Sequence, residues 1–257
     1  QMNTRIGIIG LGRLGSALAR GIDRSGHTGG LYAYNRTPSK ARIVAAQVPT
    51  LRLGSSEAEV LRQCELVFLW TKPPDALQIL EANKDLIRQQ RPLLVTCVIG
   101  VPLVRFTDRW AECLPNVNMP VRQGVTALSY APTLSESDRR LVFDALASVG
   151  SVHVLPPEEI AFYSALCSCG PALYATMLEL LADLMAARRG YDRDLCRRMV
   201  RETMLGTLLL QESDGADASE VVNRVAHPGG PSEAGVAHLR STLPALYEAM
   251  LQKMQKW

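Results

Sequence analysis

The sequence predicts an α/β fold over its first part and an all-α fold over the rest, and three observations support this division. Up to about residue 155, short apolar runs of the strand type alternate with stretches of helical periodicity, a pattern typical of βαβ units and a parallel sheet. A glycine-rich turn follows the first apolar run, and beyond residue 155 the pattern is helical only. We therefore expect a first domain over residues 1–155 and an all-helical second domain over residues 156–257.

The expected elements of the first domain alternate along the chain. The strand-like runs cover residues 5–10, 31–35, 65–71, 93–99, 124–130 and 150–155. The helical stretches cover residues 14–25, 38–47, 57–63, 75–89, 102–113 and 135–148. Because ligands of such sheets lie at the carboxyl ends of the strands, we expect the loops that follow the strands to form the binding site.

The glycine-rich turn after the first strand has the context of a dinucleotide-binding motif. Its residues are Gly10, Leu11, Gly12, Arg13, Leu14 and Gly15. The first glycine permits a tight turn, the second lets backbone N–H groups approach a diphosphate, and the third allows close helix packing. The helix that follows offers its positive N-terminus to the phosphates. The alternative is a strand–helix turn without a ligand, but the context favours a Rossmann domain that binds a dinucleotide.

The segment after the second strand indicates which dinucleotide is bound. A site that prefers NAD would place Asp or Glu there to hold the ribose 2′-hydroxyl. The sequence instead reads Asn35, Arg36 and Thr37, with Ser39 and Lys40 close behind. Arg36 can pair with a 2′-phosphate, and the other side chains add donors and charge. These residue types also suit an ordinary turn. Position and composition together favour NADP(H) as the cofactor.

Composition excludes several other classes of protein. The chain has 257 residues, 47% of them hydrophobic, and a net charge of +3 that is too small to suggest a nucleic-acid or membrane partner. No apolar run reaches the length of a membrane span, and we expect no signal peptide. The six cysteines lack the spacing of a zinc site or of an ordinary disulfide framework, so we expect no metal and reduced thiols in a cytoplasmic protein.

The second domain contains a helix that is apolar on nearly every face. It starts near Pro171 and runs through residues 173–185, where only Glu179 and Asp183 interrupt the apolar pattern, before Arg188-Arg189-Gly190 ends it. Further helices are expected over residues 193–212, 218–226 and, as two helices, 232–255. A domain of this size cannot easily cover such a helix, so we expect the helix to form a homodimer interface. Assembly of the dimers into a higher homo-oligomer is an alternative that the sequence leaves open.

At this point the sequence resembles the pyrroline-5-carboxylate reductase family, the NADPH-linked enzymes that complete proline biosynthesis. The similarity extends over essentially the whole chain, and the segments that carry it are residues 10–15, 35–37, 68–73, 114–116, 124–128, 170–172 and 228–232. The last segment, Pro-Gly-Gly-Pro-Ser, is the most specific. The resemblance implies reduction of 1-pyrroline-5-carboxylate to proline by a Rossmann domain followed by a helical dimerisation domain that interlocks with a partner subunit. It places the substrate between the nicotinamide of one chain and helices of both.

The resemblance also implies roles for individual residues. Ser232 matches a threonine whose hydroxyl lies near the imine nitrogen, which makes it the candidate catalytic residue; a helix-capping role is equally open. The other substrate-binding candidates are Gly229, Gly230, Pro231 and Cys169. Lys72 and Pro73 match residues that line the cofactor, and Asn116 matches one near the nicotinamide.

The chain departs from the family pattern on the substrate side. Thiols replace two serines at Cys167 and Cys169, His227 replaces a serine, and Pro231 removes an N–H where a substrate carboxylate would be held. The pattern after Asn116 also differs from the family's. None of these changes lies in the glycine turn. A reductase of another cyclic imine, or a non-catalytic regulatory paralogue that binds NADP, is therefore an alternative.

One absence argues against alcohol oxidation. The β-hydroxyacid dehydrogenases share this plan but use a lysine of the helical domain as acid or base, and this sequence has no lysine between Lys84 and Lys253. A cyclic imine can enter already protonated and accept hydride without a strong acid from the protein. The sequence therefore favours C=N over C=O as the reduced bond.

Overall fold

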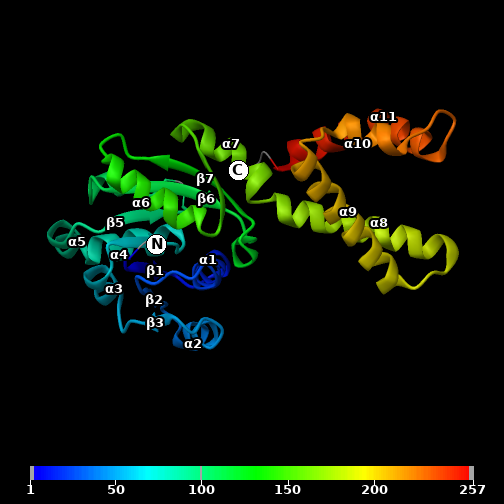
Figure 1. The fold of residues 1–257 in the computed structure, drawn as a ribbon. Coiled ribbons are helices and arrows are strands. Elements are labelled where there is room, and N and C mark those ends of the chain that lie inside the picture. Colours follow the sequence, from blue (N-terminus) through cyan, green and yellow to red (C-terminus); the bar gives the residue numbers. More distant parts are fainter. Residues whose placement is uncertain (1–2, 99, 255–257) are drawn as a thin grey trace. The chain divides into compact units, whose positions relative to one another are not determined.

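The computed structural model describes residues 3–98 and 100–254, and the chain divides into two compact units, Gln1–Pro171 and Ala172–Trp257 (Figure 1). The strands are β1 (Ile6–Ile9), β2 (Leu31–Tyr34), β3 (Leu51–Leu53), β4 (Leu66–Leu69), β5 (Leu93–Thr96), β6 (Trp110–Pro115), β7 (Gly124–Tyr130) and β8 (Gly150–Val154). The helices of the first unit are α1 (Arg13–Arg24), α2 (Pro38–Ala45), α3 (Glu57–Gln63), α4 (Pro73–Ala82), α5 (Lys84–Gln90), α6 (Glu136–Ala147) and α7 (Pro157–Cys167).

The first unit is built on one eight-stranded sheet of order β3-β2-β1-β4-β5-β6-β7-β8. All neighbouring strands are parallel except β6 and β7, which pair antiparallel, with Cys113 opposite Leu128. The chain steps outward from β1 in one direction to β3, then returns to the other side of β1 to form β4. The carboxyl ends of β1, β2 and β4 therefore lie next to one another at the point where the strand order reverses.

Helices cover both faces of this sheet, and each face has its own core. One core joins the strands to apolar residues of α1, α2 and α6, including Leu18, Val44 and Leu146. The other joins them to α3, α4 and α5 through residues such as Leu61 and Leu80. All residues of β1, β4 and β5 are buried, because a parallel sheet covered on both faces leaves no side exposed to water. The predicted α/β fold is confirmed, and the sheet, which was predicted to be parallel, departs from this only where β6 pairs with β7.

Local sequence signals explain several helix starts in the first unit. The Ser56 hydroxyl accepts a hydrogen bond from the Glu59 N–H at the start of α3, and Ser135 does the same for Asp138 in α6. Helix α1 differs, because its N-cap residue is Gly12 and no side chain caps it. Its first N–H groups are therefore available to a ligand.

The structure differs from the predicted elements of the first unit at three places. Residues 102–113 do not form a helix: a short 3₁₀ turn, η1 (Leu103–Arg105), leads into strand β6. Strand β3 has only three residues and was not predicted. The helix predicted over residues 75–89 is divided into α4 and α5 at Asn83.

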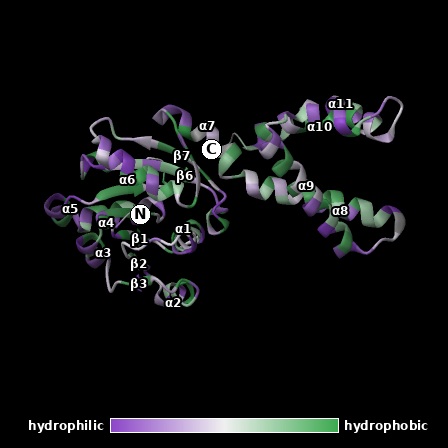
Figure 2. Ribbon diagram, in the orientation of Figure 1, coloured by the Kyte–Doolittle hydropathy of each residue, from purple (hydrophilic) through white to green (hydrophobic). Residues whose placement is uncertain are grey.

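The second unit consists of helices α8 (Gly170–Arg189, which begins in the first unit), α9 (Arg193–Asp214), α10 (Ala218–Val225) and α11 (Pro231–Met254). Asp217 and Glu220 form a capping box at the start of α10. Where two helices were predicted over residues 232–255, the structure has the single helix α11 with Pro244 inside it. Figure 2 shows hydrophobic residues in the central sheet and again along α8.

The first compact unit extends beyond residue 155, where the sequence change places the domain boundary. Helix α7 packs against β6 and β7, and Ile160 is buried. These contacts keep α7 with the sheet rather than with the helices that follow. Within the described residues, no helix has the length and apolar character needed to span a membrane.

Candidate coenzyme and substrate site

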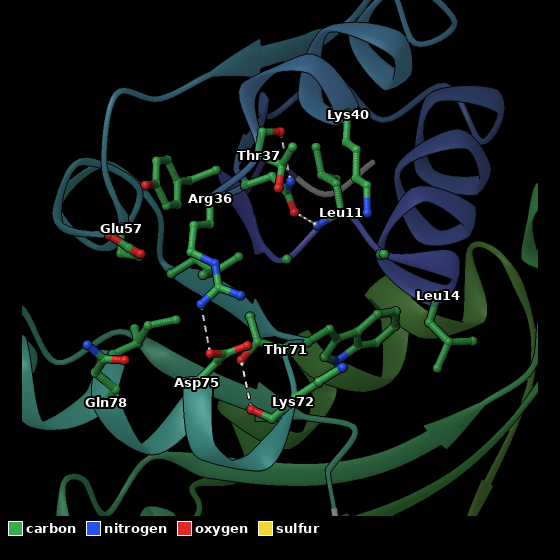
Figure 3. A pocket seen from close by; sticks show the side chains of 18 of the residues that line it. Leu11, Leu14, Arg36, Thr37, Lys40, Glu57, Thr71, Lys72, Asp75 and Gln78 are labelled. Atoms are coloured by element: carbon green, nitrogen blue, oxygen red, sulfur yellow. Dashed lines mark hydrogen bonds and ion pairs between the residues drawn. The ribbon is translucent and has the colours of Figure 1, made fainter.

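A cleft of about 800 Å³ opens at the carboxyl ends of β1, β2 and β4 (Figure 3). Most of the residues predicted to bind the cofactor line it. They are Gly10, Leu11, Gly12, Arg13, Leu14, Gly15, Asn35, Arg36, Thr37 and Lys72. The structure thus brings the glycine turn and the loop after β2 to one cavity, as expected for a site at the reversal of strand order.

The three glycines of the turn meet different requirements. Gly10 has a φ of +104°, and a Cβ atom there would lie 2.5 Å from the Trp70 carbonyl oxygen. A Cβ at Gly15 would lie 2.0 Å from the Gly10 carbonyl oxygen, so α1 packs directly on the turn. A Cβ at Gly12, in contrast, would meet no atom within 4 Å. Gly10 and Gly15 therefore serve the packing of the protein itself, whereas Gly12 leaves open space where a ligand can approach the backbone.

Asn35 shapes the turn rather than presenting its amide group freely to the cleft. Its Oδ1 accepts a hydrogen bond of 3.0 Å from the Leu11 N–H, and its Nδ2 donates one of 3.0 Å to the Thr37 carbonyl. The Leu11 N–H is therefore already bound. The N–H groups that remain for a diphosphate are those of the first turn of α1, from Arg13 onward, which has no acidic residue. These features fit a dinucleotide diphosphate.

Arg36 projects from the loop after β2, and Lys40 of α2 also lines the cleft (Figure 3). The Arg36 guanidinium does not lie free, because its NH1 donates to Asp75 Oδ1 at 2.9 Å. Asp75 belongs to the first turn of α4 and was not singled out in the sequence. Its place two residues after Pro73 at a helix start is the signal that could have identified it.

Other residues of the cleft wall were not among the predicted site residues, and Glu57, Trp70 and Cys97 are three of them. Trp70 is buried directly after β4, where its ring packs edge-on against Phe68 with 5.3 Å between ring centroids. Burial raises the pKa of the Cys97 thiol to about 12, which favours the protonated thiol over the thiolate.

Two predicted cofactor residues are not among those that line the cleft. Pro73 is the first residue of α4, where its fixed φ suits the helix start. Asn116 is buried at the end of β6, and its Oδ1 accepts hydrogen bonds from the N–H groups of Asn118 and Val125. This side chain holds the connection between β6 and β7, and its role near a nicotinamide stays a prediction.

The predicted substrate residues of the second unit lie around the start of α11. The helix begins at Pro231, so Ser232 lies inside its first turn rather than at the capping position. The Gly229 N–H donates to Glu233 Oε2 at 2.8 Å, and the Gly230 N–H donates to the His227 carbonyl at 2.9 Å. The two glycine amides are thus engaged within the chain, and a carboxylate already lies at this helix start.

The Ser232 hydroxyl is half-buried and has no hydrogen-bond partner in the part of the chain that the structure describes. In the Cys-Ser-Cys segment, Cys169 is exposed, while the Ser168 hydroxyl donates to the Pro115 carbonyl at 3.1 Å. Desolvation raises the pKa of the Cys167 thiol. All six cysteines are free, and no group of three or more potential metal ligands occurs within residues 3–98 and 100–254.

The fold and the cleft define the class of protein: an NAD(P)-binding oxidoreductase fold with an appended helical domain. Comparison with protein families supports both parts. Residues 5–100 match the family described as NADP oxidoreductase coenzyme F420-dependent, and residues 157–256 match the family described as pyrroline-5-carboxylate reductase dimerisation.

Individual relatives match along almost their whole length. The pyrroline-5-carboxylate reductase of Treponema pallidum is 27% identical over 248 residues, which cover 91% of this chain and 92% of the relative. The crystal structure of the Plasmodium falciparum pyrroline carboxylate reductase with NADP bound has a TM-score of 0.81 at 24% identity, over 96% of this chain and 93% of that one. The Coxiella burnetii pyrroline-5-carboxylate reductase structure has a TM-score of 0.85 at 20% identity, over 98% and 94%.

These matches confirm the resemblance found in the sequence. The chain belongs to the pyrroline-5-carboxylate reductase family as a distant member, and it is an NAD(P)-dependent oxidoreductase of that family.

Proposed function

We propose that this chain uses NADPH to reduce a cyclic imine, with 1-pyrroline-5-carboxylate, which would give proline, as the first candidate. The observation that carries the proposal is the cleft, which joins an open glycine turn, an uncapped helix start and the cations Arg36 and Lys40. A dinucleotide with a 2′-phosphate matches this combination of donors and charges. The family relationship over nearly the whole chain supplies the reaction type.

The protein's own groups bind and orient the reactants. The first turn of α1 holds the diphosphate, and Arg36, Thr37 and Lys40 hold the 2′-phosphate. Bound NADPH supplies the hydride to the imine carbon. The Ser232 hydroxyl is the group proposed to orient or protonate the imine nitrogen. Its unengaged, half-buried state supports this role, because its position inside the first turn of α11 does not favour helix capping.

The start of α11 favours a second candidate, an imine that lacks the carboxylate. Pro231 has no N–H, and the Gly229 and Gly230 amides are engaged by Glu233 and His227. The Glu233 carboxylate would repel a second carboxylate at the same place. This arrangement disfavours a carboxylated substrate at the α11 start.

A panel of five- and six-membered cyclic imines, each with and without a carboxylate, separates these candidates when NADPH absorbance is followed. Turnover of 1-pyrroline-5-carboxylate above its uncarboxylated analogue supports the first candidate, and the reverse order supports the second. A Pro231→Thr variant restores one N–H and is expected to tighten binding of the carboxylated imine. Tight NADPH binding without turnover of any imine would contradict the proposal and indicate a regulatory protein.

We also propose that the helical unit forms a homodimer. The exposed apolar side chains of α8 support this, among them Tyr174, Leu180 and Leu184. Residues 157–256 match the dimerisation domain of the family. A cytoplasmic location stays a prediction.

A further inference from the structure

An ion pair spans the coenzyme cleft between two walls that come from distant parts of the sequence. Arg36 follows β2, and Asp75 lies on α4 after β4, with β1 between these two strands. Arg36 NH1 and Asp75 Oδ1 are 2.9 Å apart. Figure 3 shows the two side chains pointing toward each other across the cavity, joined by this contact. The residue proposed to hold the 2′-phosphate is thus already bound to a carboxylate.

The two partners are held in place to different extents. The Arg36 side chain is 78% exposed, and Asp75 is its only partner among the described residues. Asp75 is 31% exposed and lies in the first turn of α4, where a carboxylate is favoured by the helix dipole. Exposed ion pairs of this kind hold their partners weakly. Arg36 can therefore leave the pair at little cost, whereas Asp75 stays in the cleft wall.

We propose that Asp75 is a coenzyme-specificity residue that competes with the 2′-phosphate of the coenzyme for Arg36, and so lowers the preference for NADP(H) over NAD(H). This inference rests on the proposed use of NADPH. A phosphate dianion binds a guanidinium more strongly than one carboxylate does, so it takes Arg36 from Asp75. The Asp75 carboxylate then remains near the phosphate and repels it, as does the carboxylate of Glu57, which also lines the cleft.

The Asp75→Asn variant tests this competition by removing the charge while keeping the shape of the side chain. Calorimetric titrations with adenosine 2′,5′-bisphosphate and adenosine 5′-monophosphate measure binding to the intact protein without any turnover. At low salt we expect the bisphosphate to bind about three- to tenfold more tightly to the variant, with the monophosphate unchanged, because only the former carries the 2′-phosphate. The gain is expected to shrink at high salt, where both the ion pair and the repulsion are screened.

Two further variants serve as controls. Asp85→Asn removes a carboxylate from the first turn of α5, where it pairs with Arg88, and is expected to change neither titration. In an Arg36→Ala background, Asp75→Asn is expected to give a smaller gain, because the competition for Arg36 is then absent and only the repulsion remains.

Opposite results would overturn the inference. Weaker binding of the bisphosphate to Asp75→Asn would mean that Asp75 positions Arg36 for the phosphate instead of competing for it. An equal gain in affinity for both nucleotides, or the same gain in Asp85→Asn, would show that the gain comes from the net charge of the protein and not from the position of Asp75. If the wild-type protein does not prefer the bisphosphate to the monophosphate, the proposed coenzyme is wrong and the inference fails with it. A failure to reduce imines affects none of these titrations.

Discussion

The two compact units of this chain bury their apolar side chains to very different degrees. In the first unit, large residues such as Leu18 and Phe68 are fully buried between the sheet and its helices. In the second unit, Leu184 and Leu246 are each more than 60% exposed. The apolar residues that are buried there, among those described, are the small Ala182, Ala186 and Ala216. The first unit therefore has a core of its own, whereas the second presents apolar surface that a folded chain in water normally covers.

Ion pairs contribute to the contact between the first two helices of the second unit. Arg193 of α9 pairs with Asp183 of α8, and Arg197 pairs with Glu179. Because these are partly exposed pairs, they stabilise the unit only slightly. The comparison teaches that the coenzyme cleft is lined by residues of the first unit alone, whereas the helical unit presents an apolar surface for which another copy of the chain is the proposed partner.

The largest expected effect follows from placing a charge on the apolar surface of α8. Leu181 is 49% exposed and is replaced by glutamate. The new carboxylate would be buried without a partner in the proposed dimer interface, which is energetically costly. We expect Leu181→Glu to give monomers or insoluble protein in sedimentation experiments. Val104→Glu is the matched control, because Val104 is an exposed apolar residue of the first unit, and it should sediment as the wild type does. If the Leu181 variant assembles as the wild type does, α8 does not form the dimer interface.

The second effect concerns chemistry proposed for the helical unit. If the Ser232 hydroxyl orients or protonates the imine nitrogen, Ser232→Ala should lower turnover by about 10²-fold and leave the affinity for NADPH unchanged. Ser241→Ala on the same helix, whose hydroxyl donates to the His238 carbonyl, is the control. A loss of about 1 kcal/mol of stability with full turnover would instead identify Ser232 as a structural residue of the helix start.

A smaller effect is expected from the cleft of the first unit. Arg36→Ala removes a charge-assisted contact to the 2′-phosphate, worth about 1.5–3 kcal/mol, so the KM for NADPH should rise well above that for NADH. Arg42→Ala should alter neither constant, because Arg42 is an exposed residue of α2 that is not among those lining the cleft. Equal changes in both KM values would show that Arg36 does not read the 2′-phosphate.

The smallest expected effect comes from an ion pair that lies within the first unit. Arg109, just before β6, donates two hydrogen bonds to Asp138 of α6, and these lower the pKa of the Asp138 carboxyl. Because the folded-state pKa lies below the unfolded value, the pair stabilises the fold above about pH 4 and the stabilisation is lost as the pH falls through the lowered pKa. We expect Asp138→Asn to reduce the free energy of unfolding by about 1–2 kcal/mol at neutral pH, and less in acid.

Urea unfolding at neutral and acidic pH measures this difference. Asp144→Asn provides the control, since its pair with Arg140 on the surface of the same helix should contribute little. A destabilisation of Asp138→Asn that is the same at both pH values would rule out the ion pair as its cause.

The sequence predicted the first unit well where strands are buried on both faces. Continuous apolar runs such as residues 66–69 and 93–95 are typical of strands buried on both faces, and their shortness favours a strand over a helix. The prediction failed at β6, because Leu103, Phe106, Trp110 and Leu114 follow one another at helical spacings of three and four residues. There the pairing with β5 and β7 decides the structure, and no local pattern records it. Strand β3 was missed because it has only three residues.

The residues that line the cleft were easier to predict than the ion pair within it. Residues 10–15 and Arg36 follow two neighbouring strands of the sheet, and they line one cleft as these positions predict. Their role in binding a cofactor stays a prediction. The ion pair of Arg36 with Asp75 depends on two walls that approach only in the folded sheet. Likewise, the engagement of the Gly229 amide by Glu233 depends on the geometry of the turn before α11, which the residue types alone do not determine.

Sedimentation equilibrium of the wild-type protein at micromolar concentration tests the contrast between the two units most directly. The exposed apolar surface of the helical unit predicts a species of at least twice the chain mass of 28.1 kDa, which dissociates only as the helices unfold. A folded monomer of 28.1 kDa that remains soluble under the same conditions would contradict the account, because the second unit would then be stable with its apolar surface exposed to water.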